Sequence, residues 1–192
     1  MIPVRDVIPS RTAPGVTLAL LAALGAAFLS PAVREWWLPW AADGLVVWLT
    51  GGTLEDRLGH ARFGIFAAAC AGAAAAAPAV LGHPPGLVWA ACGTAAGFIA
   101  AYVLMFPRSR VLMLVPVVVG LEVADVPAWV VFAPWAFLQG AAAWSALAAL
   151  VPADMLGMAA SVAGGALAGA LGSLLLRRPE RMRVEWWDPP RS

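Results

Sequence analysis

The sequence predicts an all-α, polytopic membrane protein with six transmembrane helices. Of its 192 residues, 62% are hydrophobic and only 12% are charged, whereas about 25% are charged in a typical soluble domain. The mean hydropathy is +0.83, and six runs with little or no charge each approach the length of about 20 residues that a membrane-spanning helix needs. This composition excludes a disordered chain and argues against an ordinary soluble domain.

The six runs take up most of the chain. In order they are Val16–Val33, Trp36–Thr53, Phe63–Leu81, Gly86–Phe106, Pro127–Val151 and Met155–Leu176. The second is the weakest, because Asp43 interrupts it. We expect the first to be retained and not cleaved as a signal peptide, since it leads into a chain that is itself membrane-like. The run Val111–Gly120 contains Pro116 and is too short to span, so we expect it to lie at the interface or to fold back against the bundle.

The arginines test this arrangement independently of hydropathy. All twelve basic residues are arginine, and six crossings place eleven of them on one side of the membrane and only Arg34 on the other. The eleven are Arg5, Arg11, Arg57, Arg62, Arg108, Arg110, Arg177, Arg178, Arg181, Arg183 and Arg191. Because short loops rich in Lys and Arg stay in the cytoplasm, both termini are predicted to be cytoplasmic, in a bacterial inner membrane.

This topology divides the chain into three segments. Residues 1–13 are predicted to form a cytoplasmic N-terminal segment, residues 14–178 the membrane domain, and residues 179–192 a cytoplasmic tail rich in Arg and Trp. Ten tryptophans, most of them near the expected span ends, are interpreted as interfacial anchors. With a net charge of only +1, the chain offers no basic surface for nucleic acid. Membrane lipids are the expected partners.

Small residues and two cysteines occur inside the spans. Two pairs have the GxxxG spacing, Gly93 with Gly97 in the fourth span and Gly165 with Gly169 in the sixth. Such spacing lets helix backbones approach closely, so we expect these two helices to pack together. Cys70 and Cys92 lie in apolar runs without CxxC spacing. We therefore expect neither a disulfide framework nor a metal site, and we expect no cofactor.

Several strings outside the apolar runs resemble a bacterial branch of the rhomboid family, the intramembrane serine proteases. They are Ile2–Thr12 (IPVRDVIPSRT), Leu54–His60 (LEDRLGH), Phe106–Val111 (FPRSRV), Leu114–Pro116 and Val126–Trp129. The resemblance extends from residue 2 to about residue 178. It implies a rhomboid-like six-helix bundle whose active site lies below the non-cytoplasmic surface and receives substrate helices from the lipid. Glu55, Asp56 and Arg57 are then interpreted as contacts that fix the cytoplasmic end of the second helix.

The resemblance also implies where catalytic residues would lie. The family uses a Ser nucleophile in a G-x-S-G context on the fourth helix and a His base on the sixth. Those positions fall on Cys92, within Ala90-Ala91-Cys92-Gly93, and on Val162. Because a hydroxyl or thiol nucleophile needs a base within hydrogen-bond reach, replacing the His removes the usual route to activation.

A second pair of family residues, a His and an Asn on the second helix, helps to stabilise the oxyanion. The register of the Leu54–His60 string places these positions at Pro39 and Asp43. A proline side chain donates no hydrogen bond, and an ionised carboxylate repels a developing oxyanion. The long first loop of the family is also reduced to a few residues around Arg34 and Glu35. We expect no catalytic residues, and we interpret these four positions as vestigial.

Three functions stay open from the sequence. The leading hypothesis is a catalytically inactive rhomboid-like protein that binds transmembrane helices of client proteins. The second is an active endopeptidase with Cys92 as nucleophile and His83, in the loop before the fourth span, as a possible base; His60 is expected on the opposite side of the membrane. The third, a small transporter or channel, has little polar lining to support it. Asp43 is a functional candidate by its membrane location, or else a carboxylate hydrated within a remnant cavity.

Overall fold

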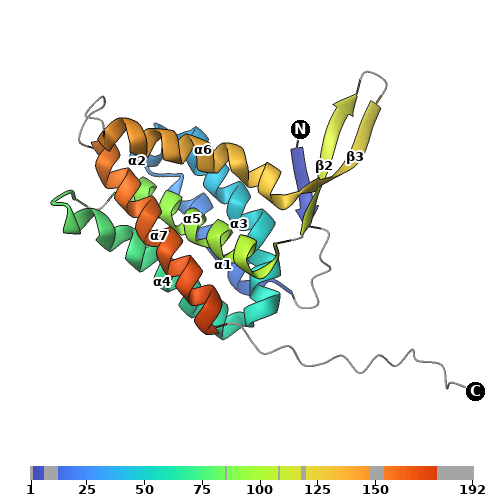
Figure 1. The fold of residues 1–192 in the computed structure, drawn as a ribbon, viewed down its shortest axis with the longest axis horizontal. Coiled ribbons are helices and arrows are strands. Elements are labelled where there is room, and N and C mark those ends of the chain that lie inside the picture. Colours follow the sequence, from blue (N-terminus) through green and yellow to red (C-terminus); the bar gives the residue numbers. More distant parts are fainter. Residues whose placement is uncertain are drawn as a thin grey trace, which may run out of the picture.

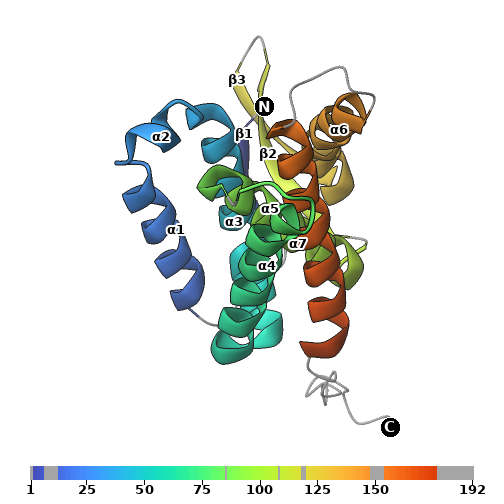
Figure 2. The same ribbon diagram turned by 90° about the vertical axis from the view of Figure 1, so that its left-hand side faces the viewer.

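The computed structural model describes residues 2–6, 13–84, 86–107, 109–117, 120–147 and 154–176. Figure 1 shows a bundle of helices with a small β-sheet beside it. The elements in chain order are β1 (Ile2–Asp6), α1 (Gly15–Ala27), α2 (Pro31–Arg34), α3 (Trp37–Leu58), α4 (His60–Val80), α5 (Leu87–Met105), β2 (Arg110–Val117), β3 (Gly120–Pro127), α6 (Ala128–Leu147) and α7 (Asp154–Leu176). In Figure 2, α1 lies on one flank of the bundle and α7 on the other.

Each of the six predicted runs overlaps one of the longer helices, and the largest differences in boundaries are in the first and second runs. The first run is divided: α1 ends at Ala27 and α2 begins at Pro31. Ser30 precedes that proline and is extended, with φ −69° and ψ 131°, because a following proline disfavours helical geometry. The second helix continues past the predicted end to Leu58 and stops at Gly59. Gly59 has a φ of 84°, which glycine adopts without steric strain.

Three helices of the described chain are long and apolar enough to cross a membrane. They are α4, α5 and the Met155–Leu176 part of α7. The apolar helix α1 and the apolar part of α6, Ala128–Phe137, are shorter. The bundle thus has the apolar helices of an integral membrane protein, while the count of six spans stays a prediction.

The structure contains a three-stranded β-sheet that the all-α prediction does not include. Its strand order is β1-β2-β3 and both pairings are antiparallel. Ile2 pairs with Leu114, and β2 pairs with β3 from Arg110 opposite Pro127 to Val117 opposite Gly120. The run Val111–Gly120, expected at the interface or against the bundle, therefore forms most of β2 and the first residue of β3. Its valine-rich sequence suits a strand, but its pairing with β1 joins residues more than a hundred positions apart.

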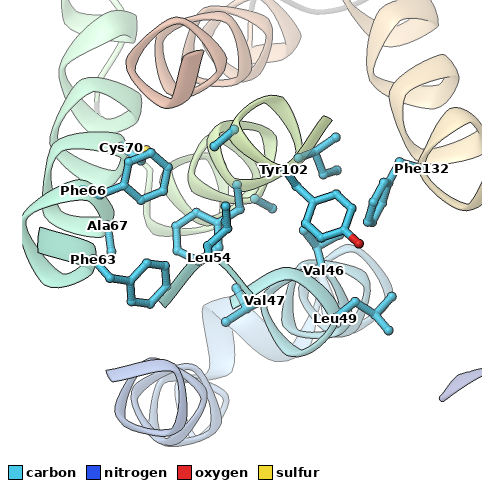
Figure 3. Packing of buried hydrophobic residues seen from close by; sticks show 14 of the residues in the cluster. Val46, Val47, Leu49, Leu54, Phe63, Phe66, Ala67, Cys70, Tyr102 and Phe132 are labelled. Carbon is cyan, nitrogen blue, oxygen red and sulfur yellow. The ribbon is translucent and has the colours of Figure 1, made fainter. Parts of the chain in front are cut away.

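Aromatic side chains form the core between α4 and α5. The rings of Phe63 and Phe66 lie 5.5 and 5.6 Å from that of Phe98, centroid to centroid, and all three side chains are fully buried. Further along α5, Tyr102 packs edge-on against Phe132 of α6 at 5.7 Å. Figure 3 shows the labelled rings of Phe63, Phe66, Tyr102 and Phe132 around aliphatic residues of α3 such as Val46 and Val47. Aromatic contacts thus join α5 to helices on both of its sides.

Candidate functional site

Close contact between α5 and α7 aligns the two helices that carry the predicted catalytic positions. A Cβ atom added to Gly165 would overlap the carbonyl oxygen of Gly93, and one added to Gly169 would overlap that of Gly97. A Cβ on Gly97 would in turn lie 2.7 Å from the carbonyl oxygen of Gly165. We call these four residues the glycine seam. The structure brings all four together, because only glycine lets the two backbones approach this closely.

Cys92 lies in α5, next to the glycine seam, and its side chain is fully buried. Its thiol faces the carboxylate of Asp43 on α3. Neither Cys92 nor Cys70 forms a disulfide. The Cys70 sulfur lies near Gly97, at 2.8 Å from a Cβ placed there. The structure therefore brings together two of the four predicted site positions, one from the second and one from the fourth of the predicted spans.

Asp43 is an internal carboxylate. Its side chain is 1% exposed and faces both the Cys92 thiol and the indole of Trp135 on α6. Within the described chain, neither carboxylate oxygen has a donor at conventional hydrogen-bond distance. Because buried polar groups are nearly always hydrogen-bonded, the Cys92 thiol and the Trp135 indole are the groups available to satisfy this carboxylate.

The other two predicted site positions, Pro39 and Val162, are less enclosed. Pro39 is half-buried near the start of α3, four residues before Asp43 and so on the same face of the helix. Val162 is half-buried on α7. Its neighbour Ser161 is fully buried, and a Cβ on Gly93 would overlap the Ser161 carbonyl oxygen. Sequence reasoning missed Ser161, although it stands four residues before Gly165 and extends the small-xxx-small spacing by one step.

A cavity of about 230 Å³ lies beside Asp43, chiefly between α1, α3 and α5. We call it the Asp43 cavity. It is lined by Leu20, Ala23, Leu24, Ala27, Trp40, Asp43, Val47, Ala71, Leu87, Ala90, Ala91, Thr94 and Phe98. Asp43 is the one acidic residue in this lining, and its carboxylate oxygens have almost no exposed surface. The Thr94 hydroxyl already donates to the carbonyl oxygen of Ala90 at 2.7 Å. Cys92 does not line the cavity, so its thiol is shielded from any molecule that enters there.

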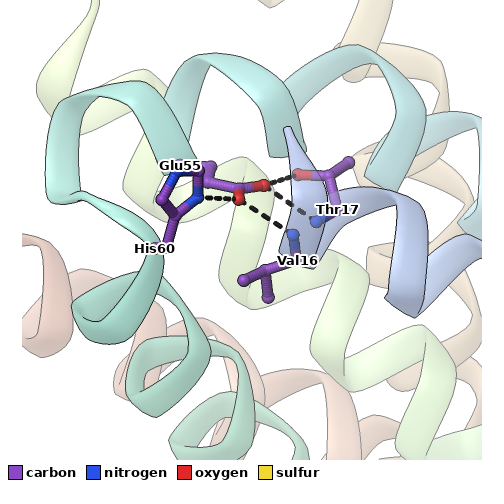
Figure 4. Close-up of polar contacts among 4 residues, drawn as sticks. All are labelled: Val16, Thr17, Glu55 and His60. Carbon is purple, nitrogen blue, oxygen red and sulfur yellow. Dashed lines mark hydrogen bonds and ion pairs between the residues drawn. The ribbon is translucent and has the colours of Figure 1, made fainter. Parts of the chain in front are cut away.

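Glu55, at the other end of α3, anchors the start of α1. Its carboxylate accepts hydrogen bonds from the backbone amides of Val16 at 2.9 Å and Thr17 at 2.8 Å, and from the Thr17 hydroxyl at 2.7 Å. His60 Nδ1 lies 2.5 Å from the same carboxylate. Figure 4 shows the four residues converging at the first turn of α1. A carboxylate at this place satisfies unpaired amides of the helix and is favoured by the helix dipole.

These contacts set the charge state of Glu55. Burial works to raise its pKa, but the hydrogen bonds from Thr17, Val16 and His60 outweigh burial and hold the pKa of Glu55 below its usual value. The residue lies beyond the predicted end of the second span. The sequence reasoning assigned Glu55 to fixing this helix end, and the observed partner is the first turn of α1.

His83, the alternative base, lies in the loop between α4 and α5. Its side chain is half-buried, and its backbone amide donates to the carbonyl oxygen of Pro78 at 3.0 Å. His60 is instead the first residue of α4, and its side chain is 55% exposed while in contact with Glu55. The carboxylate of Asp43, and not an imidazole, thus faces the Cys92 thiol. From the sequence, Asp43 is interpreted as the position of an oxyanion donor, not of a base.

A model of the Rhomboid domain matches residues 37–181, which is more than half of the chain. The chain belongs to the rhomboid family. The matched region begins with the first residue of α3 and continues beyond the end of α7, so it includes the glycine seam, Cys92 and Asp43. This rhomboid is accordingly an integral membrane protein with an apolar helical bundle. Neither a search of curated proteins nor a search of solved structures gave a match.

Proposed function

We propose that this rhomboid is a catalytically inactive pseudoprotease that binds membrane clients without cutting them. The observation that carries the proposal is the burial of Cys92, whose side chain has no exposed surface. A substrate carbonyl carbon must approach a nucleophile to about 3 Å, so a substrate peptide reaches this enclosed thiol only when the surrounding helices separate.

The chemistry of the other three positions supports the same conclusion. Val162 has no atom that can accept a proton, so the base of the family is missing. Pro39 offers no donor to an oxyanion, and an ionised Asp43 would repel one. All four positions have lost the required chemistry, while the helix packing around them is retained.

The alternative is an active endopeptidase with Cys92 as nucleophile. One observation favours it: the carboxylate of Asp43 faces the Cys92 thiol, so Asp43 is placed to accept the thiol proton. Against it, a thiol enclosed by apolar groups resists ionisation, and Asp43 occupies the position at which the family would stabilise an oxyanion.

The proposal includes an orientation in the membrane. Six spans with both termini in the cytoplasm of a bacterial inner membrane place eleven of twelve arginines on the cytoplasmic side. Residues 14–178 then form the membrane domain, between a cytoplasmic N-terminal segment at 1–13 and a cytoplasmic tail at 179–192. Clients would reach the bundle through the lipid as transmembrane helices.

The purified protein, reconstituted with a panel of single-span proteins, tests the proposal. Cleavage and co-purification of each panel member are measured for the unmodified protein and for Cys92→Ala. We expect no cleavage by either protein and equal capture of clients by both. Cleavage that disappears in Cys92→Ala would establish the thiol protease, and failure to capture any panel member would contradict client binding.

A further inference from the structure

The Asp43 cavity lies between α1 and the rest of the bundle, and five of its lining residues are alanines. Leu20 of α1, Val47 of α3 and Phe98 of α5 contribute larger apolar side chains to its walls. The alanines leave a space that none of the described residues fills. We propose that this cavity binds one acyl chain of a membrane lipid, extended along the helix axes.

Two of the polar side chains in the lining already have partners within the protein. The Thr94 hydroxyl donates to the carbonyl oxygen of Ala90 at 2.7 Å. The Trp40 indole N–H donates to the carbonyl oxygen of Leu24 at 3.0 Å. Both hydrogens are used inside the fold, so neither is left to bind a polar ligand.

The third polar side chain, that of Asp43, is turned away from the cavity. Its carboxylate faces the Cys92 thiol and the Trp135 indole, which do not line the cavity, and both of its oxygens are buried. A water molecule in a cavity needs about two to four polar partners, whereas an apolar cavity stays dry and takes up apolar molecules. The chemistry of the lining therefore selects a hydrocarbon.

The extent of the lining along the helices gives the shape of the occupant. It runs from Leu20 to Ala27 on α1 and from Leu87 to Phe98 on α5, which corresponds to about 10 Å and about 16 Å along the helix axes. The volume of about 230 Å³ exceeds the roughly 150 Å³ of an apolar cavity that binds benzene. It is below the range of roughly 300–1,000 Å³ typical of drug-sized ligands. A space of this length and volume suits part of a single acyl chain.

The cavity is open to the outside of the bundle beside α1. Helix α5 packs against α3, α4, α6 and α7, yet its residue Leu87 is 58% exposed, and Ala91 and Thr94 are only half-buried. They keep an open surface because α1, on the flank of the bundle in Figure 2, packs against α3 and α4 and leaves this side of α5 uncovered. In a membrane, lipid tails surround such apolar helices, so acyl chains are the molecules next to this opening.

Polar contacts hold α1 in the position that leaves the cavity open. At the start of α1, Glu55 accepts the backbone amides of Val16 and Thr17. Towards its end, the Trp40 indole bonds to the Leu24 carbonyl oxygen. Both attachments join α1 to α3 and neither joins it to α5. The space between α1 and α5 is therefore a defined feature of the fold.

The orientation of the cavity favours an acyl chain over a side chain of a client helix. An acyl chain in a bilayer runs along the membrane-spanning helices, as the lining of the cavity does. A side chain from a neighbouring helix would enter crosswise and fill only part of its length. This inference depends on the membrane location of the bundle and not on client binding.

Photocrosslinking in lipid vesicles tests the site. The intact protein is reconstituted in phosphatidylcholine vesicles that contain a small fraction of phosphatidylcholine with a diazirine in the middle of one acyl chain. After irradiation, labelled residues are identified by mass spectrometry. We expect labels on Ala91 and Thr94 of α5, in addition to exposed residues of α7 such as Leu171 and Leu174. Labels on the exposed residues of α7 without labels on Ala91 and Thr94 would overturn the proposal.

Substitutions that fill the cavity make this test specific. Ala23→Phe fills it from the α1 wall and Ala71→Leu from the α4 wall, so each variant should lose the label on α5 and retain the label on Leu174. The second variant keeps the test decisive if the first does not fold. Ala22→Phe is the matched control, because Ala22 is exposed on α1 outside the lining, and it should be labelled like the unmodified protein. Labels on α5 that persist in both filled variants would overturn the proposal.

A client helix is the other occupant that the experiment distinguishes. Single-span proteins that carry photo-leucine are reconstituted with the unmodified protein in vesicles without the diazirine lipid. Crosslinks from such a protein to Ala91 or Thr94, when the diazirine lipid leaves these residues unlabelled, would identify a client side chain as the occupant and overturn the lipid site. Lipid labels on α5 in vesicles that contain no client support the acyl chain, whether or not the panel in the previous section is captured.

Discussion

The carbonyl oxygen of Gly93 occupies the space in which a side chain at Gly165 would stand. At these two glycines the contact between α5 and α7 is made by backbone atoms, and it is repeated one turn later between Gly97 and Gly169. Van der Waals contact between backbones is a main source of helix association in a bilayer, where apolar side chains gain little by leaving the lipid. The bundle of this rhomboid is thus held together at the helix pair that carries Cys92 and Val162.

We predict that Gly165→Leu destabilises the protein in detergent by at least about 1–3 kcal/mol, the usual cost of overpacking. The added side chain must displace the α5 backbone, which cannot move aside as a flexible side chain can. Thermal unfolding measures the loss. The lipid-facing change Leu174→Ala, at a residue that is 58% exposed, should cost much less. Equal losses in Gly165→Leu and Leu174→Ala would show that the contact lies elsewhere.

A glycine on the surface provides a second comparison for this prediction. Gly72 of α4 has nothing within 4 Å of an added Cβ, so Gly72→Ala should leave stability unchanged or raise it slightly. Gly165→Ala should still destabilise, because one carbon atom is enough to meet the Gly93 carbonyl.

We predict that loss of the Glu55 contacts loosens α1. Glu55→Gln keeps the shape of the side chain but removes its charge, and should cost about 1.5–3 kcal/mol, the range for hydrogen bonds to charged groups. Thr17→Val removes the hydroxyl that donates to Glu55 at 2.7 Å, whereas Thr17→Ser retains it and should be milder. Unfolding in detergent measures all three variants. Glu35→Gln, at an exposed residue, is the control and should unfold like the unmodified protein.

The same residue predicts a pH dependence. The pKa of Glu55 is lower in the folded protein than its usual value of 4.5, so its ionised form stabilises the fold above that value. This stabilisation is lost as the pH falls through the lower folded pKa. The unfolding temperature of the unmodified protein, followed from about pH 7 to about pH 3, should therefore fall more steeply than that of Glu55→Gln. Parallel curves would mean that another group controls acid sensitivity.

The parts of this fold that the sequence predicts depend on local patterns. Each long apolar run contains a helix, because length and hydropathy are properties of a single segment. The division between α1 and α2 is also local in origin: Pro31 keeps Ser30 out of the helical region. The second run stops at Thr53 because charged residues follow it, whereas α3 continues through Glu55, Asp56 and Arg57 to Leu58. The partner that accommodates Glu55 is Thr17, almost forty positions away.

The features that were missed depend on distant residues. The sheet pairs Ile2 with Leu114, and no short window of sequence reveals such a partner. The four glycines can be selected by their GxxxG spacing alone. Ser161 is not part of either pair, and its backbone contact with Gly93 is visible only in the folded chain. The Asp43 cavity needs walls from separate helices, including Leu20 of α1 and Phe98 of α5, so it is visible only in the folded chain.

We predict that both termini and the Arg57–Arg62 segment face the cytoplasm, while the loop containing His83 faces the opposite side. The reason is the distribution of arginines, eleven on one side and one on the other. Reporter fusions that are active on only one side of the membrane, placed at both termini and at His83, measure the orientation. A C-terminal fusion that is active outside the cytoplasm would contradict the six-span arrangement.

The last prediction concerns restored catalysis. Cys92→Ser should show no cleavage of a fluorogenic transmembrane substrate, because a hydroxyl without a base is a weak nucleophile and the missing base alone is worth about 10²–10⁴-fold in rate. Cys92→Ser combined with Val162→His should give weak cleavage, since the glycine seam holds α5 and α7 in contact. Adding Asp43→Asn should raise the rate further, as each oxyanion donor is worth about 10²–10³-fold. Cys92→Ala with Val162→His is the matched control, because it has the base without a nucleophile and should be inactive. Activity in Cys92→Ser alone would mean that another group, with Asp43 the first to mutate, already serves as the base.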